Sequence, residues 1–196
     1  MSVIRMALEL GIDQKTTALV VIDLQKGIAG RPTQPHEAKV VIDNASKLAK
    51  AFRQKGMQVI LVHVNSRGPE RLSPPTDETW AGPANMPADW ADLVPELGQS
   101  PEDIIINKKQ WGAFYGTELE LQLRRRGIKT IVLCGISTNY GVESTARNAY
   151  EMGFHQVFAE DALTSHTKEA HEASVNLVLK RMGLVSSTSQ ILAALG

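Results

Sequence analysis

The chain has 196 residues, of which 43% are hydrophobic and 21% are charged, and its formal net charge is zero. These values are typical of one globular domain, residues 1–196, and exclude a disordered chain. Because basic and acidic residues both number 21, net charge gives no reason to expect nucleic acid or an anionic membrane as a partner. A small-molecule substrate fits this composition better.

The cysteine content and the N-terminal segment indicate the compartment. The single cysteine, Cys134, cannot form an intramolecular disulfide, which favours a reducing environment. Residues 1–13 are too short and too charged for a signal peptide, and no apolar run approaches the roughly 20 residues that span a bilayer. We therefore expect a cytoplasmic protein without membrane contact.

The first half of the chain predicts strand, helix, strand and a long loop. The apolar run TALVVID, residues 17–23, is typical of a strand buried on both faces of a parallel sheet. Apolar residues then recur at helical spacing over 36–55, and a second strand is predicted at 57–65. The loop 66–100 holds six of the nine prolines, and such a length is typical of a lid. Short helical turns are expected near 89–97.

Strands and helices continue to alternate in the second half of the chain. The remaining predicted strands are 103–107, 129–134, 156–159 and 184–187. The remaining predicted helices are 117–126, 141–152, 168–181 and 189–195. Such alternation predicts a parallel sheet covered by helices on both faces. Because ligands of such sheets bind beyond the carboxyl ends of the strands, the residues that follow each strand are the first site candidates.

Two charged residues stand at these strand ends. Asp23 ends an apolar strand, where a carboxylate is costly unless it is paired or reached by water, so it is either an acid or base or a cap. Lys108 or Lys109 is placed at the same crevice, where an ammonium group would neutralise Asp23; the alternative is a solvated lysine. Gln25 either orients a ligand or braces the loop.

Histidine and glycine patterns predict no metal and no other cofactor. His166 and His171 are five positions apart and do not share a helical face, as two metal ligands should. Phosphate-binding glycine patterns are absent from the sequence. The segment GISTN, 135–139, half-resembles a serine-hydrolase elbow at Ser137, with Asp161 and His166 as partners, but it lacks the second glycine.

Three motifs in chain order resemble the isochorismatase-like (cysteine hydrolase) superfamily. They are VIDLQ, which ends at Gln25, KKQWGAFYGT, which begins at Lys108, and GISTNYGVESTARNA, which begins at Gly135. The resemblance runs from about residue 17 to the C-terminus. It implies an α/β fold, a Rossmann-like three-layer α/β/α sandwich with a six-stranded parallel sheet, and assembly as a homo-oligomer, a dimer or a tetramer.

The resemblance also implies a catalytic set. Most members are amidases with an Asp, Lys and Cys triad, and the motifs place the Asp at Asp23 and the Lys at Lys108. The position of the nucleophile falls on Gly141, so Cys134 is misplaced by seven residues and is interpreted as a small buried hydrophobe. A glycine offers no side chain for covalent catalysis. A non-proline cis peptide is expected at Ile136–Ser137, where amidases shape an oxyanion hole.

Isochorismatases likewise carry a small residue in place of the cysteine, and they hydrolyse a vinyl ether with the Asp as general acid. We expect chemistry of this kind on a small, anionic molecule, although Lys108 would lower the pKa of Asp23 in the free enzyme. The alternative is a non-catalytic descendant that binds a small ligand or serves as a scaffold. The candidate substrate-binding residues are Gln25, Asn65, Trp111, Phe114, Ile136, Ser137 and Tyr140. Loop residues with an open choice between binding and an ordinary structural role are Arg67, Arg71, Trp80 and Trp90.

Overall fold

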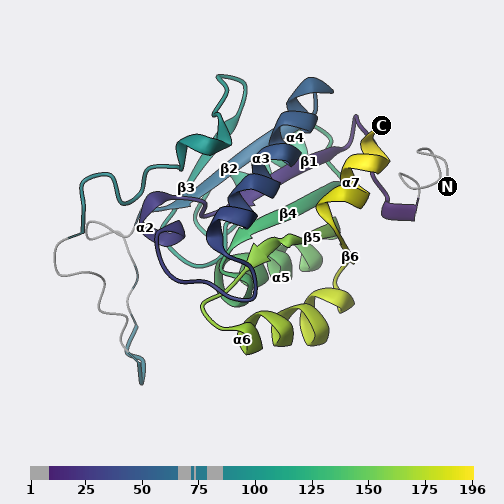
Figure 1. Ribbon diagram of the computed structural model, residues 1–196. Helices are drawn as coiled ribbons and strands as arrows, with labels where there is room; N and C mark the ends of the chain where they lie inside the picture. Colours follow the sequence, from purple (N-terminus) through teal and green to yellow (C-terminus); the bar gives the residue numbers. More distant parts are fainter. Residues whose placement is uncertain (1–8, 66–71, 73, 79–85) are drawn as a thin grey trace.

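A single parallel sheet organises the molecule. The computed structural model describes residues 9–65, 72, 74–78 and 86–196. Within this part, six strands pair in parallel in the order β3-β2-β1-β4-β5-β6 (Figure 1). The strands are β1 (Thr17–Ile22), β2 (Gln58–Val64), β3 (Ile104–Lys108), β4 (Thr130–Ile136), β5 (His155–Thr164) and β6 (Leu184–Ser186). The sheet expected from the sequence is confirmed.

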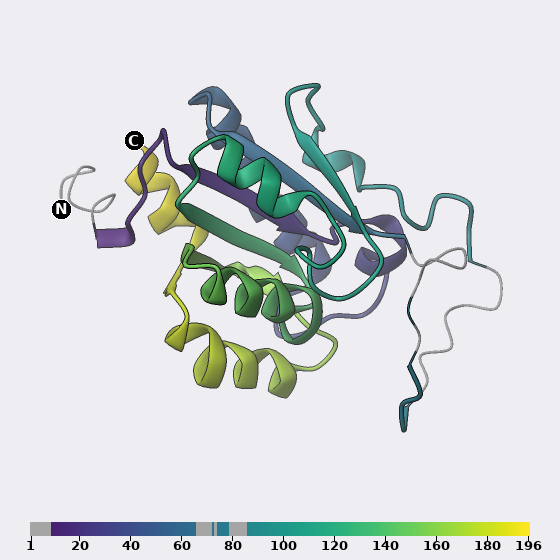
Figure 2. The same ribbon diagram turned by 180° about the vertical axis from the view of Figure 1, so that it is seen from behind.

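Helices cover both faces of the sheet. The helices are α2 (Lys26–Ala29), α3 (Ala38–Gln54), α4 (Leu119–Arg125), α5 (Glu143–Glu151), α6 (Lys168–Ala173) and α7 (Thr188–Leu195). Figure 1 shows α3 and α7 in front of the sheet, and Figure 2 shows α4, α5 and α6 on the opposite face. Two hydrophobic clusters, one on each side of the sheet, fill the layers between. The arrangement is the three-layer sandwich that the resemblance implied.

The burial pattern explains why these segments form these elements. All six residues of β1 are buried, as expected for a central strand with helices on both sides. In α3 the buried residues include Val41, Ala45, Leu48 and Phe52, which lie three or four positions apart and form one stripe against the sheet. The helix therefore has a defined inner face, and its polar face lies outward.

The described residues of the loop before β3 include a short helical turn. The 3₁₀ turn η1 (Pro95–Leu97) agrees with the helical turns expected near 89–97. The short helix α2 was not predicted from the sequence. Arg67, Arg71 and Trp80 lie outside the described residues. Trp90 is buried and packs on Gly27, where a Cβ would come within 2.1 Å of the indole ring, so Trp90 has a packing role.

The C-terminal third differs most from the prediction. The segment 168–181 is helical as expected but changes its hydrogen-bond pattern, with α6 followed by a π-helical turn η3 (Ser174–Val178) and a 3₁₀ turn η4 (Leu179–Arg181). Strand β5 is longer than predicted because it is irregular. Leu133 pairs with Phe158, whereas Gly135 already pairs with Leu163, so the residues of β5 between these partners form a bulge. Bulges of this kind change the direction in which side chains point at the end of a strand.

No helix in the described ranges is long and apolar enough to cross a membrane.

Candidate active site

Asp23, Lys108 and Gly141 meet at the carboxyl ends of the strands. The Lys108 Nζ lies 2.8 Å from the Asp23 Oδ2, and both side chains are buried. A Cβ on Gly141 would lie 2.9 Å from the Asp23 Oδ2 and 3.5 Å from the Lys108 Nζ. Three distant segments, after β1, at the end of β3 and in the π-helical turn η2 (Thr138–Val142), thus form one site.

The backbone at the ends of β1 and β4 sets this geometry. Asp23 has a φ of +52°, a left-handed conformation that aspartate adopts more readily than most residues. Its N–H donates to the Val62 carbonyl at 2.9 Å, so the carboxylate is held immediately beyond the strand. Gly135 is required beside it, because a Cβ there would lie 2.0 Å from the Ile22 carbonyl oxygen. The two strands can approach closely at the site for this reason.

The two oxygens of Asp23 have different environments. Oδ2 accepts from Lys108, whose ammonium group also donates to the Gln110 carbonyl at 3.1 Å and the Trp111 carbonyl at 2.9 Å. Oδ1 is buried and has no hydrogen-bond partner among the described residues. All three protons of Lys108 therefore have acceptors, while one oxygen of Asp23 is left for another group.

Burial raises the pKa of the Asp23 carboxyl group above its ordinary value, and the neighbouring Lys108 ammonium opposes only part of that rise. The expectation that Lys108 lowers this pKa below its ordinary value is therefore wrong, because burial has the larger effect. Because the charged carboxylate has lost its water, the neutral acid is favoured at higher pH than in a free aspartate. The proton of the neutral acid can reside on Oδ1, for which the described part of the chain provides no hydrogen-bond partner.

Cys134 lies inside the sheet and not in the site. Its side chain is fully buried within the cluster on the α3 side, and burial raises the pKa of its thiol to about 12. A thiol with this pKa is almost entirely protonated at neutral pH and is a poor nucleophile. The interpretation of Cys134 as a small hydrophobe is confirmed.

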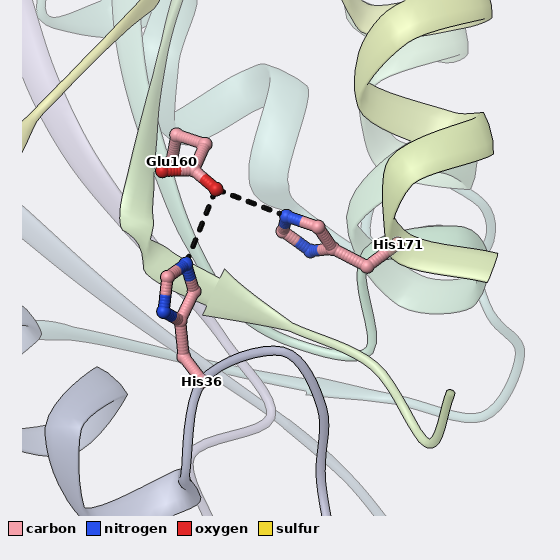
Figure 3. Close-up of side chains that lie close together, drawn as sticks. All are labelled: His36, Glu160 and His171. Atoms are coloured by element: carbon pink, nitrogen blue, oxygen red, sulfur yellow. Dashed lines mark hydrogen bonds and ion pairs between the residues drawn. The ribbon is translucent and has the colours of Figure 1, made fainter. Parts of the chain in front are cut away.

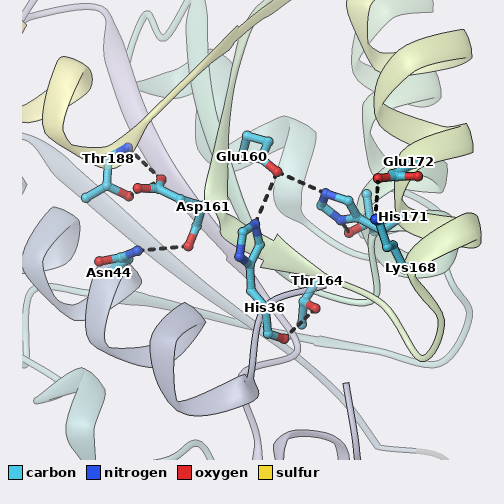
Figure 4. A network of polar contacts seen from close by, with 10 residues as sticks. His36, Asn44, Glu160, Asp161, Thr164, Lys168, His171, Glu172 and Thr188 are labelled. Atoms are coloured by element: carbon cyan, nitrogen blue, oxygen red, sulfur yellow. Dashed lines mark hydrogen bonds and ion pairs between the residues drawn. The ribbon is translucent and has the colours of Figure 1, made fainter. Parts of the chain in front are cut away.

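The peptide bond between Ile136 and Ser137 is cis, as the resemblance implied. The Ile136 side chain itself is fully buried in the core. Ser137 Oγ lies 3.5 Å from His166 Nε2, at the limit of a hydrogen bond. Asp161 does not complete a triad, because its carboxylate accepts from the Thr188 N–H and hydroxyl group at 2.6 and 2.7 Å (Figure 4). The geometry therefore does not support a serine nucleophile.

Two exposed aromatic residues belong to the segments that contain Lys108 and Gly141. Trp111 and Tyr140 meet edge to face with ring centroids 4.8 Å apart, and they are 61% and 41% exposed. Trp111 accepts from Lys108 through its carbonyl group, and Tyr140 directly precedes Gly141. Their expected contact with a ligand stays a prediction. Phe114, expected with them, is instead buried against Phe154 and belongs to the core.

Gln25 is a brace. Its Nε2 donates to the Val64 and Trp90 carbonyls at 3.0 and 3.2 Å, and its Oε1 accepts from the Val64 N–H at 2.7 Å. The side chain is fully buried, and both of its N–H donors are already used by backbone carbonyls. The structure thus favours the second of the two roles considered for Gln25, and we correct its assignment as a substrate-binding residue.

We expect Gln25→Leu to lower the free energy of unfolding by about 2–3 kcal/mol, because it leaves several buried backbone groups without partners. Urea denaturation followed by circular dichroism measures this change. Gln58→Leu is the control: this half-buried side chain donates to the Val59 and Glu102 carbonyls and accepts from Arg126. It should cost less than about 1 kcal/mol, because water can replace the contacts with Glu102 and Arg126 at their exposed positions. A loss for Gln25→Leu no larger than that of the control would contradict the bracing role.

Asn65 belongs to a different hollow of the surface. It lines a cavity of about 420 Å³ together with His63, Gln99 and Ile105. The described residues that line this cavity include neither Asp23 nor Lys108. Asn65 follows β2 and lines this cavity, so its role in substrate binding at the Asp23 site stays a prediction.

A second group of chemically active side chains was missed by the sequence analysis. His36, Glu160 and His171 bring their ligand atoms within 4.8 Å of one another. Spacing along one helix relates His171 only to His166, whereas its partners in the structure lie 11 and 135 positions away along the chain. Their proximity depends on the bulge in β5, for which the sequence carries no recognised signal.

Comparison with known proteins places the chain among hydrolases of one family. A model of the isochorismatase domain family matches residues 17–190. The chain is 52% identical over 189 residues to the uncharacterized isochorismatase family protein YecD of Escherichia coli O157:H7, covering 95% of this chain and 100% of YecD. It is 30% identical to the ureidoacrylate amidohydrolase RutB of Pantoea ananatis, covering 95% and 85%. An isochorismatase family protein from Burkholderia thailandensis superposes with a TM-score of 0.87 at 41% identity, covering 92% of this chain and 96% of that one.

Proposed function

Because this chain belongs to the isochorismatase family of hydrolases, we propose that it hydrolyses a small anionic enol ether, with Asp23 as the general acid and without a thiol nucleophile. The observation that carries this proposal is the buried Oδ1 of Asp23, which lacks a hydrogen-bond partner among the described residues. This oxygen belongs to a carboxyl group whose pKa is raised by burial. A proton donor to carbon has to be neutral at the working pH, and the raised pKa of this carboxyl group favours the neutral form.

The reaction adds one water to the substrate. Asp23 gives its proton to the terminal methylene carbon of the enol ether, and the ether oxygen stabilises the oxocarbenium ion that forms. Water attacks the cationic carbon and loses a proton, which returns to Asp23. The resulting hemiketal collapses by breaking its bond to the alcohol oxygen, so that a 2-oxo acid and an alcohol leave.

The charges at the site favour an anionic substrate. When Asp23 is neutral, the buried Lys108 ammonium group carries a positive charge without a counter-ion. A substrate carboxylate near this charge restores the balance and is attracted to the site. The same carboxylate further disfavours ionisation of Asp23. Binding of an anionic substrate and protonation of Asp23 are therefore thermodynamically coupled, each favouring the other.

Gly141 supports the absence of covalent catalysis. The Cβ position at this residue faces both Asp23 and Lys108, yet glycine places no reactive atom there. The relative RutB is named as an amidohydrolase, and amide hydrolysis by this chain would need another nucleophile. The open position instead leaves space beside Asp23 for a water molecule or for part of the substrate.

Asp23→Asn tests the proposal. We expect it to reduce the rate of pyruvate release from 1-carboxyvinyl ethers, isochorismate included, by about 100-fold or more, because the amide cannot donate a proton to carbon. Lactate dehydrogenase coupled to NADH measures the pyruvate. In D₂O, one deuterium should appear in the pyruvate methyl group. The matched control is Asp43→Asn, at an exposed acid on α3 paired with Lys39, which should leave the rate unchanged.

The pH profile provides a second readout. Because neutral Asp23 is the active form, kcat/KM should decrease as pH rises through its raised pKa. Absence of pyruvate from every vinyl ether offered, or full activity of Asp23→Asn, would contradict the proposal. Ligand-dependent thermal shifts without any turnover would favour the alternative, a non-catalytic small-molecule-binding or scaffold protein, for which the glycine at position 141 is the supporting observation.

A further inference from the structure

His36, Glu160 and His171 form a compact cluster away from the Asp23–Lys108 pair. His36 precedes α3, Glu160 lies in the bulge of β5, and His171 lies on α6. Figure 3 shows both imidazole rings directed at the same carboxylate oxygen. The His36 Nε2 and the His171 Nε2 each lie 3.1 Å from the Glu160 Oε1.

The spacing of these atoms suits a metal ion. With bonds of about 2.0–2.1 Å, the ligands of a tetrahedral zinc ion are about 3.3 Å apart. The two His–Glu distances of 3.1 Å are close to this value, and all three ligand atoms lie within 4.8 Å of one another. For a cation to bind in this geometry, the two imidazole nitrogens, which lie within 4.8 Å of each other, have to approach to about 3.3 Å. Two imidazoles and one carboxylate are a donor set that zinc uses in proteins.

The surroundings hold the ligands in place. His171 Nδ1 lies 2.9 Å from the Thr138 hydroxyl oxygen, and this contact orients the ring with Nε2 toward Glu160. The His36 carbonyl accepts from the Thr33 and Thr164 hydroxyl groups at 2.9 and 2.7 Å; the contact with Thr164 is drawn in Figure 4. The two rings are nearly perpendicular, with centroids 5.8 Å apart. A hydrogen bond to the second ring nitrogen is typical of metal-binding histidines.

Charge and exposure are also consistent with a cation site. Two neutral imidazoles and one carboxylate carry a net charge of −1, which favours a divalent cation. His171 is almost fully buried, whereas the side chains of His36 and Glu160 are 28% and 36% exposed. The cluster is therefore anchored on one side and accessible from the other, where water can supply a fourth ligand.

We propose that His36, Glu160 and His171 bind one divalent transition-metal ion, zinc or a close analogue, with at least one coordination position open to solvent. The ion would join the segment before α3, the bulge of β5 and α6. Through Thr138 it would also fix the N-terminal end of η2, the turn that contains Gly141. The proposal does not depend on the reaction proposed for Asp23.

The test uses the full chain without an affinity tag, stripped with a chelator and dialysed into a buffer that does not bind metals. Zinc is titrated by isothermal calorimetry, and bound metal is counted by atomic spectroscopy after gel filtration. We expect one ion per chain at micromolar or lower free zinc, together with a rise in melting temperature. Cobalt(II) should occupy the same site and give visible d–d absorption typical of nitrogen and oxygen ligands in a four- or five-coordinate complex.

The decisive variant is His36→Gln, because this side chain is partly exposed and its loss leaves the core intact. We expect zinc affinity to fall by about 100-fold or more, since one of three ligands is lost. Thr138→Val should weaken binding by about 10-fold, since it removes only the orienting contact. The control is His155→Gln, which removes an exposed histidine outside the cluster and should leave zinc affinity unchanged.

The possible results separate two roles for the cluster. Stoichiometric binding that His36→Gln abolishes and His155→Gln retains supports the metal site. If zinc shows no saturable binding, or if His36→Gln binds it as tightly as the parent chain, the cluster is a hydrogen-bonded His–Glu network and the proposal is wrong.

Discussion

Lys108→Met is expected to lower the free energy of unfolding by about 3 kcal/mol at pH 7, because it breaks a buried ion pair and leaves its partner behind. Both side chains are nearly inaccessible to solvent, so water cannot replace the lost ammonium group around Asp23. Asp23 can only avoid a buried charge by taking up a proton. Methionine has a similar length to lysine, so little of the loss should come from an empty cavity. Urea denaturation measures the change.

The pH dependence of the same variant has a definite sign. Without Lys108, the folded-state pKa of Asp23 rises further above its unfolded value, because no ammonium group remains to counteract the effect of burial on the carboxyl group. The folded state then binds more protons than the unfolded state above about pH 4, so stability falls as pH increases through this window. The slope reaches about 1.4 kcal/mol per pH unit and ends at the folded-state pKa of Asp23.

Two further variants complete the experiment. Asp23→Asn combined with Lys108→Met removes both charged groups, so it should recover stability at pH 7 relative to Lys108→Met and lose the added pH dependence. Lys39→Met, at an exposed i,i+4 pair on α3, is the matched control and should change stability by less than about 0.5 kcal/mol. A stability of Lys108→Met equal to that of the parent chain, or a loss independent of pH, would show that the pair is not buried as described.

The fold could be predicted from the sequence because its elements are locally consistent. The uninterrupted apolar run of β1 and the regular stripe of α3 each indicate one type of element, and their alternation indicates a parallel sheet. Strand β5 was predicted too short because polar residues, Glu160 and Asp161, interrupt its apolar pattern. In the structure these residues lie in a bulge, so the strand continues beyond them.

The centre of the site could also be predicted, but its surroundings could not. Asp23 and Lys108 follow strands, and the order of strands in a parallel sheet brings such ends together. Gln25 and Asn65 also lie at strand ends, yet one side chain bonds to backbone and the other lines a separate cavity. The direction of a side chain beyond a strand depends on loop backbone angles such as the +52° φ of Asp23, and the sequence pattern does not specify them.

The position left open by Gly141 leads to the second large effect. Gly141→Cys is expected to create a thiol that iodoacetamide alkylates at pH 7 about 1,000-fold faster than Cys134, or more. The new Cβ would lie 3.5 Å from the Lys108 Nζ, and a nearby ammonium group lowers the pKa of a thiol. Cys134, whose pKa is about 12, has only about one thiolate in 100,000 molecules at pH 7. A thiol with a pKa of about 8.5 or lower has a few per cent or more.

Crowding opposes this substitution but does not forbid it. The Cβ would lie 2.9 Å from the Asp23 Oδ2 and 3.0 Å from the Ile22 Cγ2, so neighbouring atoms have to move by a few tenths of an ångström. Gly141 lies outside the left-handed region, so its backbone conformation accepts a side chain. We expect a loss in the free energy of unfolding of about 1–2 kcal/mol, which leaves the protein folded.

Peptide mapping by mass spectrometry distinguishes the two thiols, and the parent chain serves as the control because it contains Cys134 alone. Adding Lys108→Met to Gly141→Cys should slow alkylation of the introduced thiol at pH 7, since its pKa is no longer lowered by the ammonium group. Equal labelling rates with and without Lys108, or labelling of Cys134 before the introduced thiol, would mean that position 141 does not face the Asp23–Lys108 pair. The proposed chemistry without a thiol depends on that geometry. A nucleophile would have to stand at a position that faces the pair, and Gly141 leaves that position without a reactive side chain.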